Sequence, residues 1–296
     1  MTAIMANGIT LEYEESGNPK NPAILLIRGL GTQLIDWPKA FIDGLADQGF
    51  RVIYHDNRDV GLSAKFEAAD VPDIAEATAK VNAGEKIQSA YTMDDMALDV
   101  IGLQDALNID SAHIVGISMG GIIAQIVAAN HTDRTKSLTS VMSGSGNLSL
   151  STATPEVLEA ITNPPENPED RDGIIAHGTE LLRIFGSKGY PESEEIRRKI
   201  TTARYERCYY PPGIARQMMA ILADGSRVEL LKTITVPALV IHGADDPLVA
   251  VEAGEDTAAN IPNARLEIIE GMGHNIPAPL VPKLVDLIVN HAKGHG

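Results

Sequence analysis

The segment from residue 113 to 129 constrains the fold of this 296-residue chain more than any other. An apolar run at 114–117 leads into Ser118, which lies between Gly116 and Gly120 in the pattern G-x-S-x-G, and an apolar run follows. Small residues at these two positions let a strand and a helix meet in a tight turn that exposes the serine. The pattern predicts a strand, a sharp turn at Ser118 and a helix whose N-terminus can receive negative charge.

Strand-like and helix-like segments alternate on both sides of this turn. Apolar or alternating runs predict strands at 9–14, 23–27, 50–55, 114–117, 137–142, 236–242 and 266–269. Helical spacing predicts helices at 37–48, 74–81, 92–107, 122–129, 249–260 and 279–291. Thr92 and Asp95 have the spacing of a capping box. The alternation indicates an α/β fold with a mostly parallel sheet between helices.

Residues 145–232 break this rhythm. They contain proline-rich turns at 163–168 and 209–213, charged helix-like segments, notably 192–205, and an amphipathic run at 214–222, without a strand pattern. We therefore expect a helical lid inserted between the sixth and seventh strands of the sheet. The predicted organisation is a core domain of residues 1–144 and 233–296 with a cap of residues 145–232.

The composition narrows the choice of partners. A net charge of −16 disfavours nucleic acid and anionic membranes, which attract basic surfaces. The chain has neither a signal-peptide pattern at its start nor an apolar run long enough to span a membrane, so we expect a cytoplasmic protein, a monomer or a homodimer. The single cysteine, Cys208, excludes an intrachain disulfide and a cysteine-rich metal site.

Two later segments carry the groups that a serine nucleophile requires. A serine hydroxyl needs an imidazole to take its proton and a carboxylate to orient that imidazole. Asp246 lies in a turn after the strand at 236–242, and His274 follows the strand at 266–269. Because parallel strands bring their carboxyl ends to one edge, we expect Ser118, Asp246 and His274 to meet there as a catalytic triad.

With these segments the chain resembles α/β-hydrolases of the esterase and lipase kind over nearly its whole length, and the triad order agrees. Residues 243–247 match the family's G-x-x-D-P segment, and residues 271–274 match its G-x-G-H segment. Residues 56–63 resemble its D-x-R-G-x-G-x-S loop, with Asp59 where glycine is usual. This variant is similar to polyketide methylesterases of the aclacinomycin methylesterase type, which act on anthracycline precursors. The resemblance implies an α/β-hydrolase fold with an eight-stranded sheet.

The same resemblance assigns the acid and the oxyanion hole. Asp246 directly precedes the proline and is the expected acid, whereas Asp245 is expected to cap the turn. Residues 28–31 align with the family's H-G-x-G loop, so the N–H groups of Leu30 and Met119 are expected to bind the oxyanion.

Four further residues are candidates for substrate binding. Arg28 and Gly29 belong to the H-G-x-G-like loop, and Arg28 replaces the usual histidine. One interpretation makes Arg28 a strand-end residue in a salt bridge, and the other brings it near the acyl pocket to attract a carboxylate or carbonyl. Tyr210 and Met219 of the lid are candidates for the pocket wall, although both suit a lid core equally.

These observations predict a serine hydrolase that cleaves small-molecule carboxylic esters, of short to medium chain length or methyl esters, through an acyl-enzyme. No cofactor or metal is expected, because dinucleotide, P-loop and H-E-x-x-H patterns are absent from the sequence. The alternatives on the same triad are a lactonase, a C–C bond hydrolase and a cofactor-free haloperoxidase or perhydrolase. An alternative of another class is a non-catalytic, ligand-binding protein of this fold, which we would expect to lack a triad residue.

Overall fold

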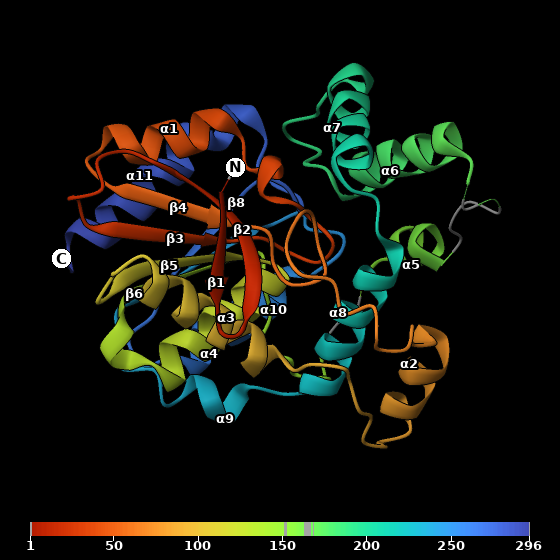
Figure 1. Ribbon diagram of the computed structural model, residues 1–296, viewed down its shortest axis with the longest axis horizontal. Coiled ribbons are helices and arrows are strands. Elements are labelled where there is room, and N and C mark those ends of the chain that lie inside the picture. Colours follow the sequence, from red (N-terminus) through yellow and green to blue (C-terminus); the bar gives the residue numbers. More distant parts are fainter. Residues whose placement is uncertain (1, 151–152, 163–166, 168, 296) are drawn as a thin grey trace.

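The computed structural model describes residues 2–150, 153–162, 167 and 169–295. Their centre is an eight-stranded sheet in the order β1-β2-β4-β3-β5-β6-β7-β8 (Figure 1). The strands are β1 (Thr2–Ala6), β2 (Ile9–Ser16), β3 (Ala23–Ile27), β4 (Arg51–His55), β5 (Ala112–Ile117), β6 (Thr135–Val141), β7 (Ala238–Gly243) and β8 (Arg265–Ile269). β2 runs antiparallel to β1 and β4. The other six strands, in the sheet order β4-β3-β5-β6-β7-β8, are mutually parallel.

Helices cover both faces of the sheet, which explains why its central strands are apolar on both sides. On one face α3 (Met93–Ala106), α4 (Met119–Asn130) and α10 (Val251–Asn260) pack against residues such as Leu25 and Ile114. On the other face α1 (Lys39–Asp47) and α11 (Val281–Lys293) pack against residues such as Leu26 and Val115. Neighbouring residues of one strand thus enter two different cores.

The helices between β6 and β7 are α5 (Pro155–Thr162), α6 (Arg171–Phe185), α7 (Glu194–Arg207), α8 (Pro211–Asp224) and α9 (Val228–Leu231). In Figure 1, α5 to α8 lie to one side of the sheet, together with α2 (Ile74–Asn82). α2 packs against α8, whereas α9 packs against α4 and α10. Short 3-10 turns complete the fold at η1 (Leu34–Asp36), η2 (Thr132–Arg134) and η3 (Ala278–Leu280).

The predicted strands and most of the predicted helices are present, and the capping box at the start of α3 is confirmed. The Thr92 side chain accepts the Asp95 N–H, and the Asp95 carboxylate accepts the Thr92 N–H. α6 was not predicted as a separate helix. The predicted turn at 163–168 falls, apart from residue 167, outside the described residues. In the part of the chain that the structure describes, no helix has the length and apolar character needed to cross a membrane.

Sequence analysis missed β1. This strand pairs with β2 through a two-residue turn, Asn7-Gly8, in which both residues have positive φ (49° and 76°). Asn-Gly is the preferred sequence for such a hairpin turn because both residues tolerate this conformation. The Asn-Gly pair was therefore the signal that could have predicted β1.

Candidate active site

Ser118 lies at the turn between β5 and α4, with φ 56° and ψ −123°. A non-glycine residue in this conformation is strained and persists only where its surroundings hold it. The neighbouring glycines explain how it is held. A Cβ atom on Gly116 would come within 2.0 Å of the Gly120 carbonyl oxygen, and one on Gly120 within 2.2 Å of the Ile27 carbonyl oxygen. The strand and helix approach so closely that only glycine fits at either position.

The loop after β3 passes directly beside this serine. A Cβ atom on Gly29 would lie 3.1 Å from Ser118 Cβ and 3.5 Å from Ser118 Oγ. The loop closes on itself, because Thr32 donates both its N–H (3.3 Å) and its hydroxyl (2.9 Å) to the Gly29 carbonyl. The structure thus brings the Arg28–Gly31 segment and the N-terminus of α4 to the same hydroxyl. An N–H group at either place can stabilise the negative charge that develops on the carbonyl oxygen of a substrate bound next to Ser118.

Asp246 and His274 meet at the same edge of the sheet, after β7 and β8. The His274 Nδ1 lies 2.7 Å from Asp246 Oδ2, and the carboxylate is buried. Burial alone would raise the pKa of the Asp246 carboxyl. The adjacent His274 ring and the Val249 N–H outweigh burial and hold this pKa below its usual value. Asp246 is therefore ionised at neutral pH and suited to orient the His274 ring.

The expectation for the neighbouring Asp245 was wrong. The turn N–H groups of Leu248 and Val249 donate to Asp246 Oδ1, at 2.9 and 2.8 Å, so Asp246 caps the turn as well as holding His274. Asp245 is exposed. One carboxylate serves both purposes because each of its oxygens has its own partners.

Ser118 and the Asp246–His274 pair lie at the carboxyl ends of strands of the same sheet. Within the described residues, the Ser118 hydroxyl makes no hydrogen bond to His274. Bonds between a nucleophile and its base are often long in unliganded enzymes and tighten in the substrate complex. The arrangement is therefore compatible with proton transfer from Ser118 once a substrate is bound.

His242, at the end of β7, supports Asp246 from behind. Its Nε2 lies 2.8 Å from the Val249 carbonyl oxygen and 3.6 Å from Asp246 Oδ2. Burial lowers the pKa of His242, so the ring is neutral and its Nε2–H donates to the carbonyl. It therefore adds no charge that would compete with His274.

Residues 145–232, referred to below as the insertion, hold the loop that carries His274. The His274 N–H donates to the Phe185 carbonyl at 2.7 Å. The Ser187 hydroxyl accepts the Gly273 N–H at 2.9 Å and donates to Asn275 Oδ1 at 2.6 Å. Sequence analysis missed this bracing, because Phe185 and Ser187 belong to no motif and lie far from His274 in the chain.

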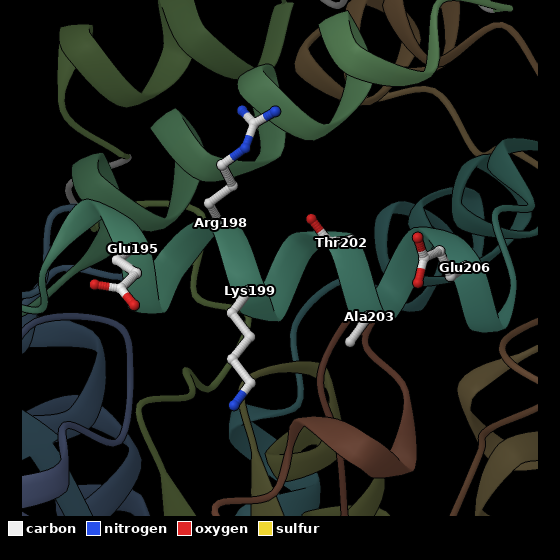
Figure 2. Close-up of a pocket in the computed structure, with 6 residues that line it drawn as sticks. All are labelled: Glu195, Arg198, Lys199, Thr202, Ala203 and Glu206. Atoms are coloured by element: carbon white, nitrogen blue, oxygen red, sulfur yellow. The ribbon is translucent and has the colours of Figure 1, made fainter.

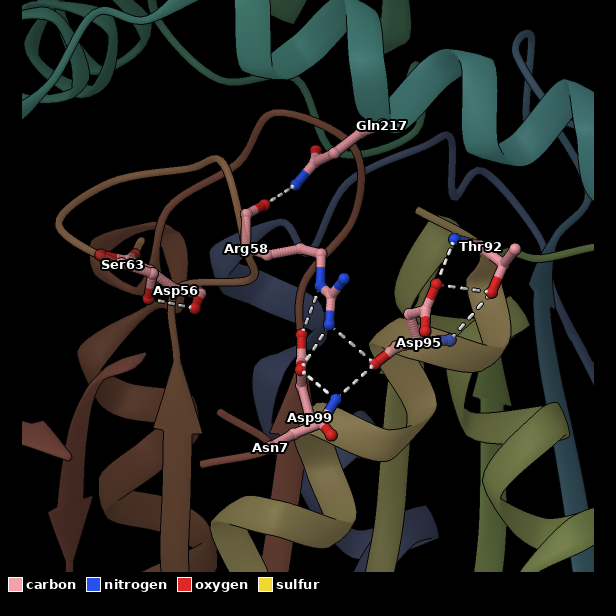
Figure 3. Close-up of polar contacts among 8 residues, drawn as sticks. All are labelled: Asn7, Asp56, Arg58, Ser63, Thr92, Asp95, Asp99 and Gln217. Carbon is pink, nitrogen blue, oxygen red and sulfur yellow. Dashed lines mark hydrogen bonds and ion pairs between the residues drawn. The ribbon is translucent and has the colours of Figure 1, made fainter. Parts of the chain in front are cut away.

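The loop of residues 56–63 is a second point where the insertion contacts the core. Asp59 has a positive φ of 67°, and its carboxylate pairs with Arg216 of α8 at 2.8 and 2.9 Å. Arg58 pairs with Asp99 at 2.7 Å (Figure 3). The buried Asp56 side chain accepts the Leu34 N–H at 2.7 Å. This loop therefore joins α8, α3 and the segment after β3 through buried charges.

Arg28 does not form the salt bridge that one interpretation expected of it. No carboxylate of the described residues lies within ion-pair distance of its guanidinium, which stacks 4.8 Å from the centre of the Trp37 ring. Asp36, whose charge acts on Arg28, is bound by Arg204 at 2.6 Å. Burial lowers the pKa of Arg28 to about 10. The arginine is still charged at neutral pH, held by an aromatic face instead of a carboxylate.

The two lid candidates lie on or beside α8. The Tyr210 hydroxyl accepts a hydrogen bond from Arg216 Nη2 at 3.0 Å, so this tyrosine belongs to the contact between α8 and residues 56–63. Met219 is half-buried on α8. Tyr210 therefore has a structural partner outside the site, and Met219 stays a candidate for the pocket wall.

A hollow of about 450 Å³ lies along the outer side of α7 (Figure 2). It is lined by Glu195, Arg198, Lys199, Thr202, Ala203 and Glu206. All six come from one helix, and most are exposed and charged, so this is an open helix surface and not an enclosed binding site. The described residues hold no group of three or more His, Cys, Asp and Glu side chains that could bind a metal ion.

Comparisons with known proteins agree with this geometry. The alpha/beta hydrolase fold family matches residues 22–278, and the chain belongs to this family. Two similar relatives are rhodomycin D methylesterases. DauP from Streptomyces sp. (strain C5) is 27% identical over 98% of this chain and 97% of its own length, and DnrP from Streptomyces peucetius is 27% identical over 96% and 95%.

A solved structure with the same fold is a meta-cleavage product hydrolase from Pseudomonas fluorescens IP01. It has a TM-score of 0.75 and 22% identity, and the match covers 100% of this chain and 98% of that one. At this identity the likeness supports the fold and leaves the reaction open. This protein is therefore a hydrolase by family, and its reaction has to be argued from its site.

Proposed function

We propose that this hydrolase cleaves carboxylic esters by two-step acyl transfer through Ser118. The observation that carries the proposal is the 2.7 Å contact between His274 Nδ1 and the buried Asp246 carboxylate, at the edge of the sheet where Ser118 holds its strained turn. An ionised acid on one ring nitrogen leaves the other nitrogen as a base. Two methylesterase relatives that match over nearly the whole chain support the ester as substrate.

In the proposed mechanism, His274 Nε2 takes the proton of Ser118 as Oγ attacks the ester carbonyl. The N–H groups of Leu30 and Met119 bind the oxyanion of the tetrahedral intermediate. His274 then gives its proton to the leaving alcohol, and the acyl group stays on Ser118. A water molecule, deprotonated by His274, cleaves this acyl-enzyme and releases the acid.

The relatives indicate the class of substrate. Because both are methylesterases of a small molecule, we propose a small-molecule ester, with a methyl ester as the first candidate. Residues 145–232 would form a cap that provides a wall of the acyl pocket over a core of residues 1–144 and 233–296. We propose that the enzyme acts in the cytoplasm as a monomer or homodimer.

The C–C bond hydrolase is one rival with a counterpart of the same fold, the meta-cleavage product hydrolase, and the lactonase is another, because an enol-lactonase also shares the fold. Lactonase and cofactor-free haloperoxidase activities use the same groups and remain alternatives. A non-catalytic binding role is disfavoured, because such a protein would have no need to keep a buried carboxylate paired with His274. The ester reading is favoured because the two relatives that are 27% identical over 98% and 96% of the chain are methylesterases.

The test is hydrolysis of p-nitrophenyl acetate, butyrate, octanoate and palmitate by the wild type, Ser118→Ala and Ser143→Ala. Ser143 is a matched control, since it is buried beside Gly121 and its hydroxyl has no hydrogen-bond partner. We expect turnover that collapses in Ser118→Ala and persists in Ser143→Ala. The chain-length profile then measures the acyl pocket. A folded wild type that turns over none of these esters would contradict the proposal.

A further inference from the structure

Gln217 of α8 is a fully buried glutamine whose amide joins two loops of the core. Its Oε1 accepts the Gly31 N–H at 2.9 Å, and its Nε2 donates to the Arg58 carbonyl at 2.7 Å. Figure 3 shows the amide above the Arg58 carbonyl, on the helix that crosses over this part of the sheet. Both ends of the amide are therefore hydrogen-bonded, the oxygen to the loop after β3 and the nitrogen to the loop of residues 56–63.

The bond to Gly31 holds the middle of a tight turn. Gly31 has a φ of +64°, and Thr32 donates to the Gly29 carbonyl, which together fit a type II turn over residues 29–32. The Gly31 N–H belongs to the central peptide of such a turn, and rotation of that peptide converts one turn type into another. The Gly31 and Thr32 N–H groups are both bonded within the fold, so Leu30 carries the N–H that this turn can offer to an oxyanion.

The other end of the amide is attached to a fixed point. The Arg58 side chain is buried and paired with Asp99 at 2.7 Å, and Asn57 donates to the Arg28 carbonyl at 3.0 Å. α8 itself is fixed by the Arg216–Asp59 pair one residue away. The Gln217 amide therefore connects the turn to two elements that buried ion pairs hold in place.

We propose that Gln217 is a positioning residue for the oxyanion hole. By holding the central Leu30–Gly31 peptide, it fixes the turn whose preceding peptide, Gly29–Leu30, points its Leu30 N–H toward the carbonyl oxygen that becomes negative when Ser118 attacks. The inference rests on the proposed function and adds to it that part of the oxyanion hole is positioned from the cap. Its consequence is that the cap contributes to the chemical step as well as to the pocket wall.

The test compares Gln217→Met with Gln104→Met. Gln104 of α3 is an equally buried glutamine, bonded to the Arg134 carbonyl at 3.2 Å, and controls for the loss of a buried amide. With p-nitrophenyl butyrate, Gln217→Met should lower kcat by about 10- to 100-fold and leave KM nearly unchanged, because a misplaced donor affects the transition state. The inhibition constant of n-butylboronic acid, which forms a tetrahedral boronate on Ser118 with one oxygen in the place of the oxyanion, should rise in parallel. Gln104→Met should change neither.

The outcomes separate the two proposals. Equal kcat and equal boronic acid inhibition in Gln217→Met and Gln104→Met would overturn the role of Gln217, while loss of turnover in Ser118→Ala would still support the esterase. Turnover that survives in Ser118→Ala would overturn the esterase mechanism itself. If Gln217→Met does not fold, Gln217→Glu replaces it. Because Gln217→Glu keeps an acceptor for the Gly31 N–H and loses only the donor to the Arg58 carbonyl, it is compared with Gln217→Lys, which keeps a donor for that carbonyl and loses the acceptor for Gly31. Wild-type kcat in Gln217→Lys would overturn the inference.

Discussion

At the scale of single residues, Asp245 and Asp246 are adjacent in the chain and lie in opposite surroundings. Asp246 is buried against His274, whereas Asp245 is exposed. Asp246→Asn should therefore lower kcat by about 10⁴-fold, because an amide favours the wrong tautomer of the histidine. Asp245→Asn is the matched control and should retain kcat. Steady-state kinetics with p-nitrophenyl butyrate measures both, and comparable losses in the two variants would contradict the assignment of Asp246.

The pairing of Asp246 with His274 could be predicted from the sequence because it depends on a local spacing, the aspartate directly before a proline. The capping role given to Asp245 could not, because two adjacent carboxylates in a turn look alike in sequence. Which of them turns inward depends on the partner that β8 brings to it. The contacts of Arg28 could not be predicted for the same reason. Its guanidinium stacks on Trp37, while the nearby Asp36 carboxylate pairs with Arg204, which comes from a distant part of the chain.

At the scale of elements, α8 and the loop of residues 56–63 are joined by the buried Arg216–Asp59 pair. Asp59→Gly restores the residue usual in the family and relieves a positive φ. The variant should nevertheless lower the free energy of unfolding by roughly 2 kcal/mol or more, because it leaves the buried Arg216 charge without its carboxylate partner. Urea denaturation measures this loss.

The double variant Asp59→Gly with Arg216→Met completes this prediction. Removing both charges leaves neither one buried alone, so most of the lost stability should return. Additive losses in the double variant would show that the two side chains contribute independently and would contradict the pairing as the source of the effect.

The contacts of the insertion are the part of the fold that the sequence predicted least. Helical spacing identified 192–205 and 214–222 as helix-like, since periodicity is local. It could not show that Gln217 and Arg216 face the core, because polar residues on an amphipathic helix ordinarily face solvent. The sequence did show that Asp59 stands where the family usually has glycine. The structure adds that Arg216 is the residue with which Asp59 pairs.

At the scale of the whole molecule, the sheet and the edge that carries Ser118, Asp246 and His274 were predictable. Apolar runs on both faces identify buried parallel strands, and parallel strands place their carboxyl ends together. The bracing of that edge by Phe185, Ser187 and Gln217 was not predictable, because it joins segments that are 86 to 186 residues apart.

Besides His242, three buried histidines make the stability of the whole molecule depend on pH. Burial lowers the pKa of His55, His113 and His291 to about 4. Their pKa in the unfolded chain is about 6.5, so between these values the unfolded state binds protons that the folded state does not. The stability from the neutral rings is complete above pH 6.5 and is lost as the pH falls toward 4. The free energy of unfolding should decrease by up to about 4 kcal/mol per pH unit at the steepest point.

Two buried carboxyl groups oppose this loss of stability at the lower end of the pH range. Burial raises the pKa of Asp56 and Asp99, so the folded state takes up their protons first and gains stability as the pH falls. The histidine effect should therefore be clearest between pH 7 and 5.5, measured by urea denaturation at each pH. His113→Asn removes one titrating ring while keeping a partner for the Ser137 hydroxyl. It should reduce the slope of the unfolding free energy against pH by the contribution of about one bound proton. An unfolding free energy that stays constant from pH 7 to 5.5 would contradict the neutral buried rings.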